Sequence, residues 1–176
     1  FYGGLIGGML AVLIYCAIHK KNFFALIDII APSLICAQGI GRWGNFFNQE
    51  AFGYYVSNPN LQWFPFSVYI DSCHQTGCLC GGSGWHLATF FYESLWNFIT
   101  FAVLMLLLYK VDFKQNGMIA SFYLLLYGIG RMFIEGLRTD SLYLGSIRIS
   151  QLLSVIFIFV GLVSILYYFY KNRKKK

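Results

Sequence analysis

The strongest constraint on the fold of this chain is a series of five long apolar runs. A helix needs about 20 apolar residues to cross the hydrocarbon core of a bilayer, and each run reaches or approaches that length. Inside lipid, a helix pairs its own backbone N–H and C=O groups, whereas an irregular segment leaves them without partners. We therefore predict five membrane-spanning helices, over residues 1–18, 23–40, 87–109, 117–134 and 147–170.

The composition also indicates a membrane protein. Hydrophobic residues make up 58% of the chain and charged residues only 11%, whereas a soluble domain has about 25% charged residues. The predicted class is an all-α polytopic membrane protein. One membrane domain over residues 1–176 would form a transmembrane helix bundle, with a long outer loop region at 41–86 and a basic tail at 171–176. The first residue, Phe1, already lies in an apolar run, which we interpret as truncation of a longer chain.

The lysines indicate the orientation in the membrane. All eight follow the first, third or fifth run: Lys20, Lys21, Lys110, Lys114, Lys171, Lys174, Lys175 and Lys176. If successive helices alternate in direction, these places share one side, which should be the cytoplasm because cytoplasmic loops are enriched in Lys and Arg. The loop region 41–86 is then expected outside and the C-terminus inside. The basic tail is expected to contact the lipid surface, and we expect no nucleic-acid partner.

Four arginines lie on the opposite, outer side, at or near the ends of the runs: Arg42, Arg131, Arg138 and Arg148. An arginine inside a spanning helix costs about 2.5–3.5 kcal/mol on insertion scales, so it needs a partner or a function. Arginine has a planar fork of donors that suits phosphate oxygens. The arginines therefore predict a phosphate-bearing ligand in the outer leaflet.

Spacing places part of this group on one helix face. In YGIGRMFIEGLR, the residues Tyr127, Arg131, Glu135 and Arg138 are separated by four, four and three positions, which aligns them along a helix. Arg131 and Glu135 can pair, which leaves Arg138 and Arg42 with uncompensated positive charge. The structural alternative is that Arg131 and Glu135 only clasp helices together, while Arg138 extends to the membrane interface.

The segment GRWGNFFNQEAFG, residues 41–53, adds polar groups at the same end of the bundle. Asn45 and Asn48 supply amide donors and acceptors, and Glu50 supplies a carboxylate. Helix packing alone would not account for two amides and a charge at one bilayer end. Three glycines allow backbones to approach closely or to leave helical geometry: Gly39, Gly41 and Gly44.

Four stretches together carry a resemblance to a known family. GRWGNFFNQEAFG resembles the Gly-Arg-x-Gly-Asn-Phe-x-Asn-x-Glu-x-x-Gly motif of the prolipoprotein diacylglyceryl transferases. YGIGRMFIEGLRTDSLYLG, from Tyr127, resembles the second arginine motif of that family. TFFYESLWN, residues 89–97, is similar to the family's Leu-Tyr-Glu-Ser-Leu-Trp-Asn helix start, and YGGLIGG, residues 2–8, is similar to the start of an earlier helix.

The resemblance implies a seven-helix enzyme of the bacterial cell membrane, here without about two N-terminal spans. Such an enzyme moves the diacylglyceryl group of phosphatidylglycerol to the thiol of a lipobox cysteine in a prolipoprotein and releases glycerol phosphate. The reaction needs no metal and no redox cofactor. By resemblance, Arg42 and Arg131 are catalytic. The expected substrate-binding residues are Arg42, Asn45, Asn48, Glu50, Gly53, Tyr127, Glu135 and Arg138.

The chain departs from the family at two places. Many members have a histidine, cast as the base, where this chain has Tyr2. A tyrosine has a pKa near 10 and is a poor base, so the base stays open between Tyr2, Glu135, the substrate phosphate and the field of the arginines alone. In HLATFFYE the family's proline is replaced, and we expect His86 to be an interfacial residue at a helix start rather than a catalytic one.

The cysteines fall into two groups. Cys16 and Cys36 lie in apolar runs and are expected to be inert buried thiols. Cys73, Cys78 and Cys80 lie in the outer loop region. Together with His74 and His86 they match no common zinc spacing, and an oxidising exterior favours a disulfide with one cysteine left over, or free thiols, over a metal site.

Two other functions are alternatives to the transferase. The first is a membrane transporter or channel with an outer-leaflet anion site. It is disfavoured because the polar residues gather at the outer ends of the runs and the cytoplasmic halves have few of them. The second is a lipid phosphatase, which would need a nucleophile or metal-binding carboxylates, and no Asp-rich motif occurs.

Overall fold

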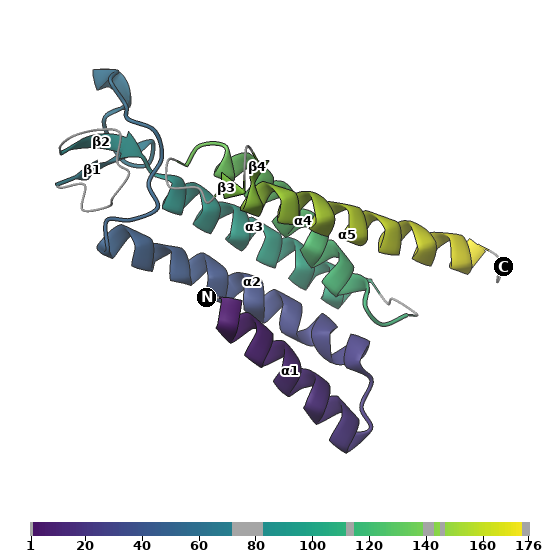
Figure 1. The fold of residues 1–176 in the computed structure, drawn as a ribbon. Coiled ribbons are helices and arrows are strands. Elements are labelled where there is room, and N and C mark those ends of the chain that lie inside the picture. Colours follow the sequence, from purple (N-terminus) through teal and green to yellow (C-terminus); the bar gives the residue numbers. More distant parts are fainter. Residues whose placement is uncertain (1, 72–82, 112–114, 139–142, 145–146, 174–176) are drawn as a thin grey trace.

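Five helices form most of the computed structural model, which describes residues 2–71, 83–111, 115–138, 143–144 and 147–173 (Figure 1). Helices α2 to α5 lie side by side as a bundle, and α1 diverges from α2. A small sheet lies beyond the C-terminal end of α2. The helices are α1 (Tyr2–His19), α2 (Phe23–Phe47), α3 (Thr89–Lys110), α4 (Met118–Glu135) and α5 (Ile149–Arg173), with a short 3₁₀ helix η1 (Pro59–Leu61) and strands β1 (Ser67–Ile70), β2 (Gly84–Leu87), β3 (Tyr143–Leu144) and β4 (Ile147–Arg148).

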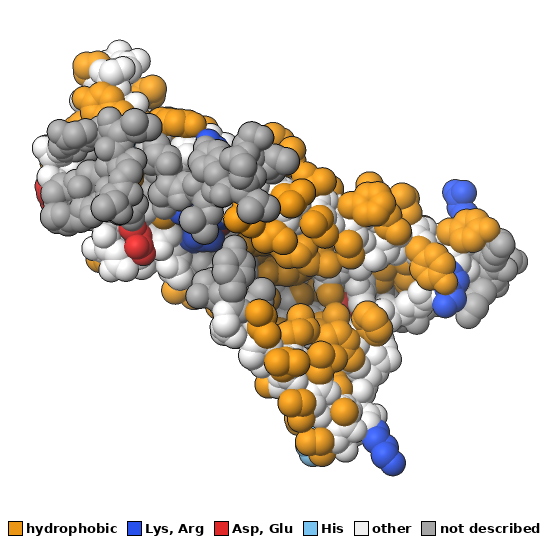
Figure 2. All heavy atoms as spheres, viewed as in Figure 1, with side chains coloured by type: hydrophobic (Ala, Val, Ile, Leu, Met, Phe, Trp, Pro, Cys, Tyr) orange, Lys and Arg blue, Asp and Glu red, His pale blue; other side chains and the backbone are white. Residues whose placement is uncertain are grey.

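Four of these helices are long and apolar enough to cross a membrane, namely α2, α3, α4 and α5 up to Lys171. The predicted class, a helical polytopic membrane protein, is confirmed. Apolar side chains cover the helices on the face shown in Figure 2, with basic side chains at the far ends of α1 and α5. This distribution suits helices that are surrounded by lipid along their length.

Helix α2 differs from its predicted extent. We expected a span that ends near Ile40, but the helix continues through Gly41 and Gly44 to Phe47. The glycines therefore do not leave helical geometry, and Arg42 lies inside the helix rather than after it. A Cβ placed on Gly39 would lie 3.4 Å from Asn97 and from Phe98, so Gly39 does pack closely. Apart from neighbouring residues of α2, no described atom lies within 4 Å of a Cβ placed on Gly41 or Gly44.

The loop region 41–86 contains two paired strands. β1 and β2 pair antiparallel, with Ser67 opposite Leu87. The other edge of β2 pairs with the chain just after α2, through hydrogen bonds from Gly53 N–H to Leu87 O and from Val56 N–H to Trp85 O, 3.0 and 2.8 Å long. His86 lies within β2 and is buried. Our expectation of an interfacial residue at a helix start is therefore wrong, because α3 begins only at Thr89.

Helix α4 lies between two neighbours that approach its backbone closely. Toward α5, a Cβ placed on Gly161 would lie 2.7 Å from the carbonyl oxygen of Ser121, and one placed on Gly128 would lie 2.9 Å from that of Ser154. Toward α3, the indole ring of Trp96 occupies the space that a side chain at Gly130 would need. Small residues at these contacts let the helices pack without a hydrophobic driving force between them.

The N-terminus of α4 is capped by a side chain from another helix. The carboxylate of Asp28 in α2 accepts hydrogen bonds from Gly117 N–H, at 2.6 Å, and from Ala120 N–H, at 2.8 Å. The first N–H groups of a helix have no partner within it, and the carboxylate also opposes the positive end of the helix dipole. Asp28 thus joins α2 to α4 at the end of the bundle away from the sheet.

We predict that Asp28→Ala lowers the thermal unfolding midpoint of the purified protein in detergent. The free energy of unfolding should fall by about 1–2 kcal/mol, the usual effect of removing a capping side chain. Asp28→Asn should lose less, because its amide oxygen still accepts one bond. Asp71→Ala is the control, since the Asp71 carboxylate accepts a hydrogen bond from Gln49, outside the bundle. An unchanged midpoint for Asp28→Ala would contradict the capping role.

Candidate active site

Three helices meet at the carboxylate of Glu93, which is only 3% exposed. Glu93 lies near the start of α3 and contacts arginines from both neighbours. Its Oε1 atom lies 2.5 Å from Nη2 of Arg42 in α2. Both of its oxygens accept hydrogen bonds from Nη1 of Arg131 in α4, each 3.1 Å long. One buried carboxylate therefore orients two guanidinium groups.

Arg131 has a second acidic partner on its own helix. Its Nη2 atom lies 2.7 Å from Oε2 of Glu135, one turn further along α4. This contact brings opposite charges together without the alignment of a hydrogen bond, since Oε2 has no hydrogen-bond partner among the described residues. The predicted Arg131–Glu135 pair is present, but Arg131 lies between two carboxylates rather than facing one.

The charges of these four side chains balance: two arginines and two glutamates sum to zero. Our expectation that Arg42 has uncompensated positive charge is wrong, because Glu93 neutralises it. The exposure of the four groups differs, however. The arginine side chains are 20% and 14% exposed, whereas the glutamates are almost fully buried. The exposed part of the cluster therefore belongs mainly to the arginine side chains.

Hydrogen bonds beside the cluster fix the helices that carry it. The indole N–H of Trp43 donates to Ser94 Oγ at 3.1 Å, and that hydroxyl donates to the carbonyl of Gly39 at 2.8 Å. These bonds join α2 to α3 next to Arg42 and Glu93. On the other side of α3, the indole N–H of Trp96 donates to the carbonyl of Leu126 in α4, at 2.9 Å. The helices that carry the arginines are therefore joined by hydrogen bonds to α3.

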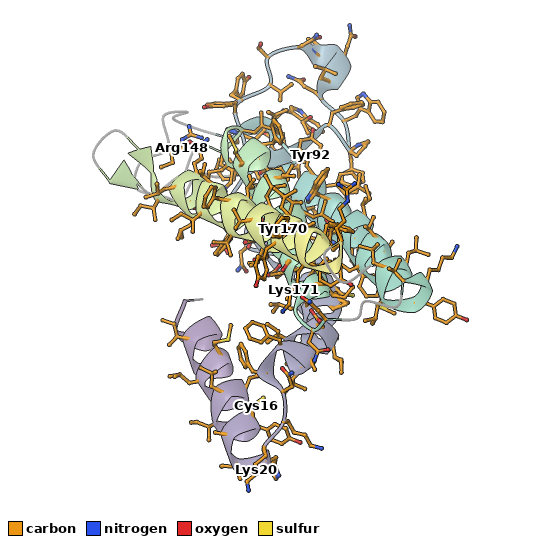
Figure 3. The ribbon with its side chains drawn as sticks, turned by 90° about the vertical axis from the view of Figure 1, so that its right-hand side faces the viewer. Cys16, Lys20, Tyr92, Arg148, Tyr170 and Lys171 are labelled. Carbon is orange, nitrogen blue, oxygen red and sulfur yellow. The ribbon has the colours of Figure 1, made fainter. Side chains whose placement is uncertain are left out.

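The chain segment that follows α2 also contacts the segment that follows α4. Gly53 and Arg138 form an isolated antiparallel β-bridge. Arg148, just before α5, donates to the backbone carbonyl of Glu135 and lies 3.5 Å from the hydroxyl of Tyr54. Figure 3 shows Arg148 beside the start of α5, with Lys171 near its other end. The residues after α2 and the residues after α4 are thus held against each other.

The turn after α2 has unusual backbone conformations. Gln49 and Ala51, on either side of Glu50, have positive φ angles of 50° and 57°. Residues other than glycine rarely adopt this region, and such conformations persist where surrounding contacts hold them. The hydroxyl of Thr89 donates to the carbonyl of Ala51 at 2.7 Å and supplies one such contact.

This sequence matches the family model described as "Prolipoprotein diacylglyceryl transferase" over residues 1–167. The chain belongs to the prolipoprotein diacylglyceryl transferase family. The predicted resemblance is therefore confirmed, over nearly the whole chain.

Relatives in three bacteria carry names that specify the reaction further. "Phosphatidylglycerol--prolipoprotein diacylglyceryl transferase 1" of Clostridium perfringens (strain 13 / Type A) is 45% identical over 175 residues. The transferase of Clostridium botulinum (strain Loch Maree / Type A3) is 47% identical over 175 residues, and that of Limosilactobacillus reuteri (strain DSM 20016) is 44% identical over 177 residues. These matches cover 99%, 99% and 97% of the chain but only 64%, 64% and 60% of the relatives.

The other predicted site residues make contacts of their own. Tyr127 stacks on Tyr123 in α4, with ring centroids 5.7 Å apart. Arg138 is placed by its bridge to Gly53. Asn48 and Glu50 contact each other at 3.3 Å on the exposed turn, and the backbone carbonyl of Asn45 accepts from Glu50 N–H.

Some predictions fall on parts that the structure does not describe. The side chain of Tyr2 lies outside the described residues, as do Cys73, His74, Cys78 and Cys80. Cys16 is buried and Cys36 partly buried, both as free thiols. Among the described residues, no group of three or more His, Cys, Asp or Glu side chains could hold a metal ion.

The most important residue that our sequence analysis did not assign is Glu93. It stands in the fifth position of TFFYESLWN, a stretch we used only for the resemblance. A carboxylate inside an apolar run needs a buried cationic partner, and that rule alone could have connected it to an arginine. The choice of Arg42 and Arg131 depends on helix packing, which spacing along one helix does not reveal.

We predict that Glu93→Gln strongly destabilises the protein, although the side chain keeps its shape. Removing one partner of a buried ion pair leaves the other charge uncompensated and costs about 3–5 kcal/mol. The measurement is the thermal midpoint in detergent. The matched control is Glu50→Gln on the exposed turn, which should change stability by less than about 0.5 kcal/mol. Equal midpoints for the two variants would show that the arginines do not depend on Glu93.

A second prediction concerns the contact between the segment after α2 and the segment after α4. A Cβ at Gly53 would lie 2.7 Å from Leu87 Cβ and 2.8 Å from the carbonyl oxygen of Leu137. Gly53→Ala should therefore destabilise the protein by about 1–3 kcal/mol through overpacking. Gly44→Ala, in an open part of α2, should be neutral or stabilise the helix by about 0.5–1 kcal/mol. Unfolding midpoints compare the two, and a neutral Gly53→Ala would argue against the close junction.

Proposed function

We propose that the full-length protein transfers the diacylglyceryl group of phosphatidylglycerol to a cysteine thiol of a prolipoprotein. The observation that supports this most directly is the pair of arginines held by Glu93, whose side chains are more exposed than the glutamates they contact. Family membership and the names of the relatives supply the identities of the lipid and of the acceptor. The acceptor segment that we propose is the lipobox.

The reaction replaces one bond to a glycerol carbon by another. The thiolate sulfur attacks the carbon that bears the phosphate, the S–C bond forms, and the C–O bond to the phosphate breaks. The bonding electrons leave with that oxygen as glycerol phosphate, and the thiol proton passes to a base or to solvent. The two places that need stabilisation are the thiolate, from a thiol of pKa about 8.5, and the phosphate on which charge accumulates.

A cluster of zero net charge can still bind a phosphodiester. The contacts to Glu93 engage Nη2 of Arg42 and Nη1 of Arg131, and a guanidinium has five N–H donors. The carboxylates hold these groups in place, so their remaining donors are oriented before the lipid arrives. Arg138 lies within electrostatic range of Arg42 and adds a positive charge at the edge of the cluster.

We assign roles on this basis. Arg42 and Arg131 hold the phosphate during transfer, and Arg138 supports them. Tyr2 and Glu135 are the candidates for receiving the thiol proton, with the substrate phosphate or the arginine field as alternatives. The residues proposed to contact or shape the substrate are Asn45, Asn48, Glu50, Gly53 and Tyr127.

We further propose that the cluster faces the outer leaflet of a bacterial cell membrane and that the C-terminus is cytoplasmic. The support is the separation of charges along the bundle. Glu93 at the start of α3 and Arg131 near the end of α4 lie toward the sheet, whereas Lys110 at the end of α3 and Lys171 at the end of α5 lie toward the opposite side. Cytoplasmic ends are enriched in lysine.

The alternative of a transporter or channel has less support. The relatives described above are named as transferases. The charged cluster at one end of the bundle suits an enzyme that works on a headgroup at the membrane interface.

Lysine substitution of the two arginines tests this function. Lysine keeps the charge but loses the planar two-pronged geometry. We predict that Arg42→Lys and Arg131→Lys each lower turnover roughly 10²–10³-fold, the usual effect of removing one oxyanion donor, while the protein still inserts and folds. The assay follows the mass gain of a lipobox peptide, with full-length protein and phosphatidylglycerol. Arg173→Lys, at the far end of α5, serves as the control and should keep normal turnover. Near-normal turnover in both cluster variants would contradict the proposal and would indicate that the arginines have only a structural role.

A further inference from the structure

Each helix of the cluster has an uncharged hydrogen-bonding side chain four residues from its ionic residue. In α2, Gln38 precedes Arg42; in α3, Asn97 follows Glu93; in α4, Tyr127 precedes Arg131. Because α3 runs opposite to α2 and α4, all three positions are displaced in the same direction, away from the sheet. Four residues correspond to about 6 Å along a helix. We call Gln38, Asn97 and Tyr127 the amide–tyrosine layer.

Asn97 is the most informative member of this layer. It is 1% exposed, and its Nδ2 atom has no hydrogen-bond partner among the described residues. A buried amide donor without a partner is costly, so each such group calls for an explanation. Asn97 lies next to Gly39, where a Cβ would be 3.4 Å from Asn97 Cβ. The amide is therefore held close to α2, one turn from the ion cluster.

The rest of the layer has the same chemical character. Gln38 Nε2 donates to the hydroxyl of Tyr123 at 3.1 Å, and the rings of Tyr123 and Tyr127 are nearly parallel, with centroids 5.7 Å apart. Gln38, Tyr123 and Tyr127 are only partly buried. Each of these groups, like Asn97, can donate an N–H or O–H. An uncharged ligand that only accepts hydrogen bonds would complement them.

We propose that the amide–tyrosine layer binds the ester carbonyls of the diacylglyceryl group, with Asn97 as a positioning residue. This assignment rests on the proposed transferase function. The ester carbonyls of a glycerophospholipid lie on the hydrocarbon side of its phosphate, as the layer lies on the membrane side of the arginines. Carbonyl oxygens accept hydrogen bonds and do not donate them, which matches the donors of the layer.

Two points of attachment would orient the reacting bond. The attacked glycerol carbon lies between the phosphate and the ester groups of the lipid. If the arginines hold one end and the layer holds the other, the C–O bond that breaks has a fixed direction relative to the incoming sulfur. Fixing this geometry lowers the entropic part of the barrier. The layer also makes the site selective for lipids with ester-linked chains.

The test compares two lipids that differ only at these carbonyls. Full-length protein is assayed with phosphatidylglycerol and with its diether analogue of the same chain length, using the same lipobox peptide. We expect the wild-type protein to favour the diester in kcat/KM by roughly 2- to 10-fold, the effect of one net hydrogen bond. In Asn97→Leu, which has a similar shape and no amide, this preference should vanish, and kcat/KM for the diether should stay within about twofold of wild type.

Thr100→Val is the matched control, because Thr100 is a buried polar residue of α3 that lies further from the cluster. It should change both lipids equally. If Asn97→Leu does not accumulate, the partly buried Gln38→Leu gives a second measurement, with the same expected loss of preference. Equal use of both lipids by the wild-type protein would overturn the proposal. An equal loss on both lipids in Asn97→Leu would also overturn it, since the amide would then serve the protein frame. No transfer from either lipid by the wild-type protein would instead contradict the transferase function itself.

Discussion

The arrangement of this bundle depends on the ion pairs that the carboxylate of Glu93 makes with two arginines. A buried ion in a membrane protein is tolerated only with partners, and here one anion supplies the partner for two cations from different helices. The requirement acts on the fold and on the chemistry together. It draws α2 and α4 toward α3, and it leaves the guanidinium groups oriented before any ligand binds. Stability and preorganisation therefore have the same physical origin.

The sequence predicted those features that depend on residues close together in the chain. Apolar runs predicted the helices because chain length and hydropathy decide whether a segment can cross lipid. The i, i+4 spacing predicted the contact of Arg131 with Glu135, since both lie on one helix. The partnership of Glu93 with Arg42 was not predicted, and neither was the capping of α4 by Asp28. These contacts join residues far apart in the chain, and only helix packing determines which of them meet.

The glycines near the end of α2 left two possibilities open, close packing or a break in the helix. Glycine permits a helix to end but does not require it, and α2 continues past Gly41 and Gly44 to Phe47. The chain turns only at Gln49 and Ala51, two residues for which a positive φ is unfavourable. Contacts to β2 and Thr89 hold that turn, so tertiary structure decides where the helix ends. No residue-by-residue propensity would have placed it there.

The capping of α4 has a consequence for how the chain can vary. Asp28 holds the first turn of α4, and Glu93 holds Arg131 in its last turns. The helix is thus clamped at two heights by carboxylates from two other helices. One residue added or removed between the clamps would rotate one end relative to the other by about 100° and shift it by about 1.5 Å, so that both could not be engaged at once. Between its contacts to Asp28 and to Glu93, helix α4 must therefore keep a fixed number of residues, which sets both its length and its rotation about the helix axis.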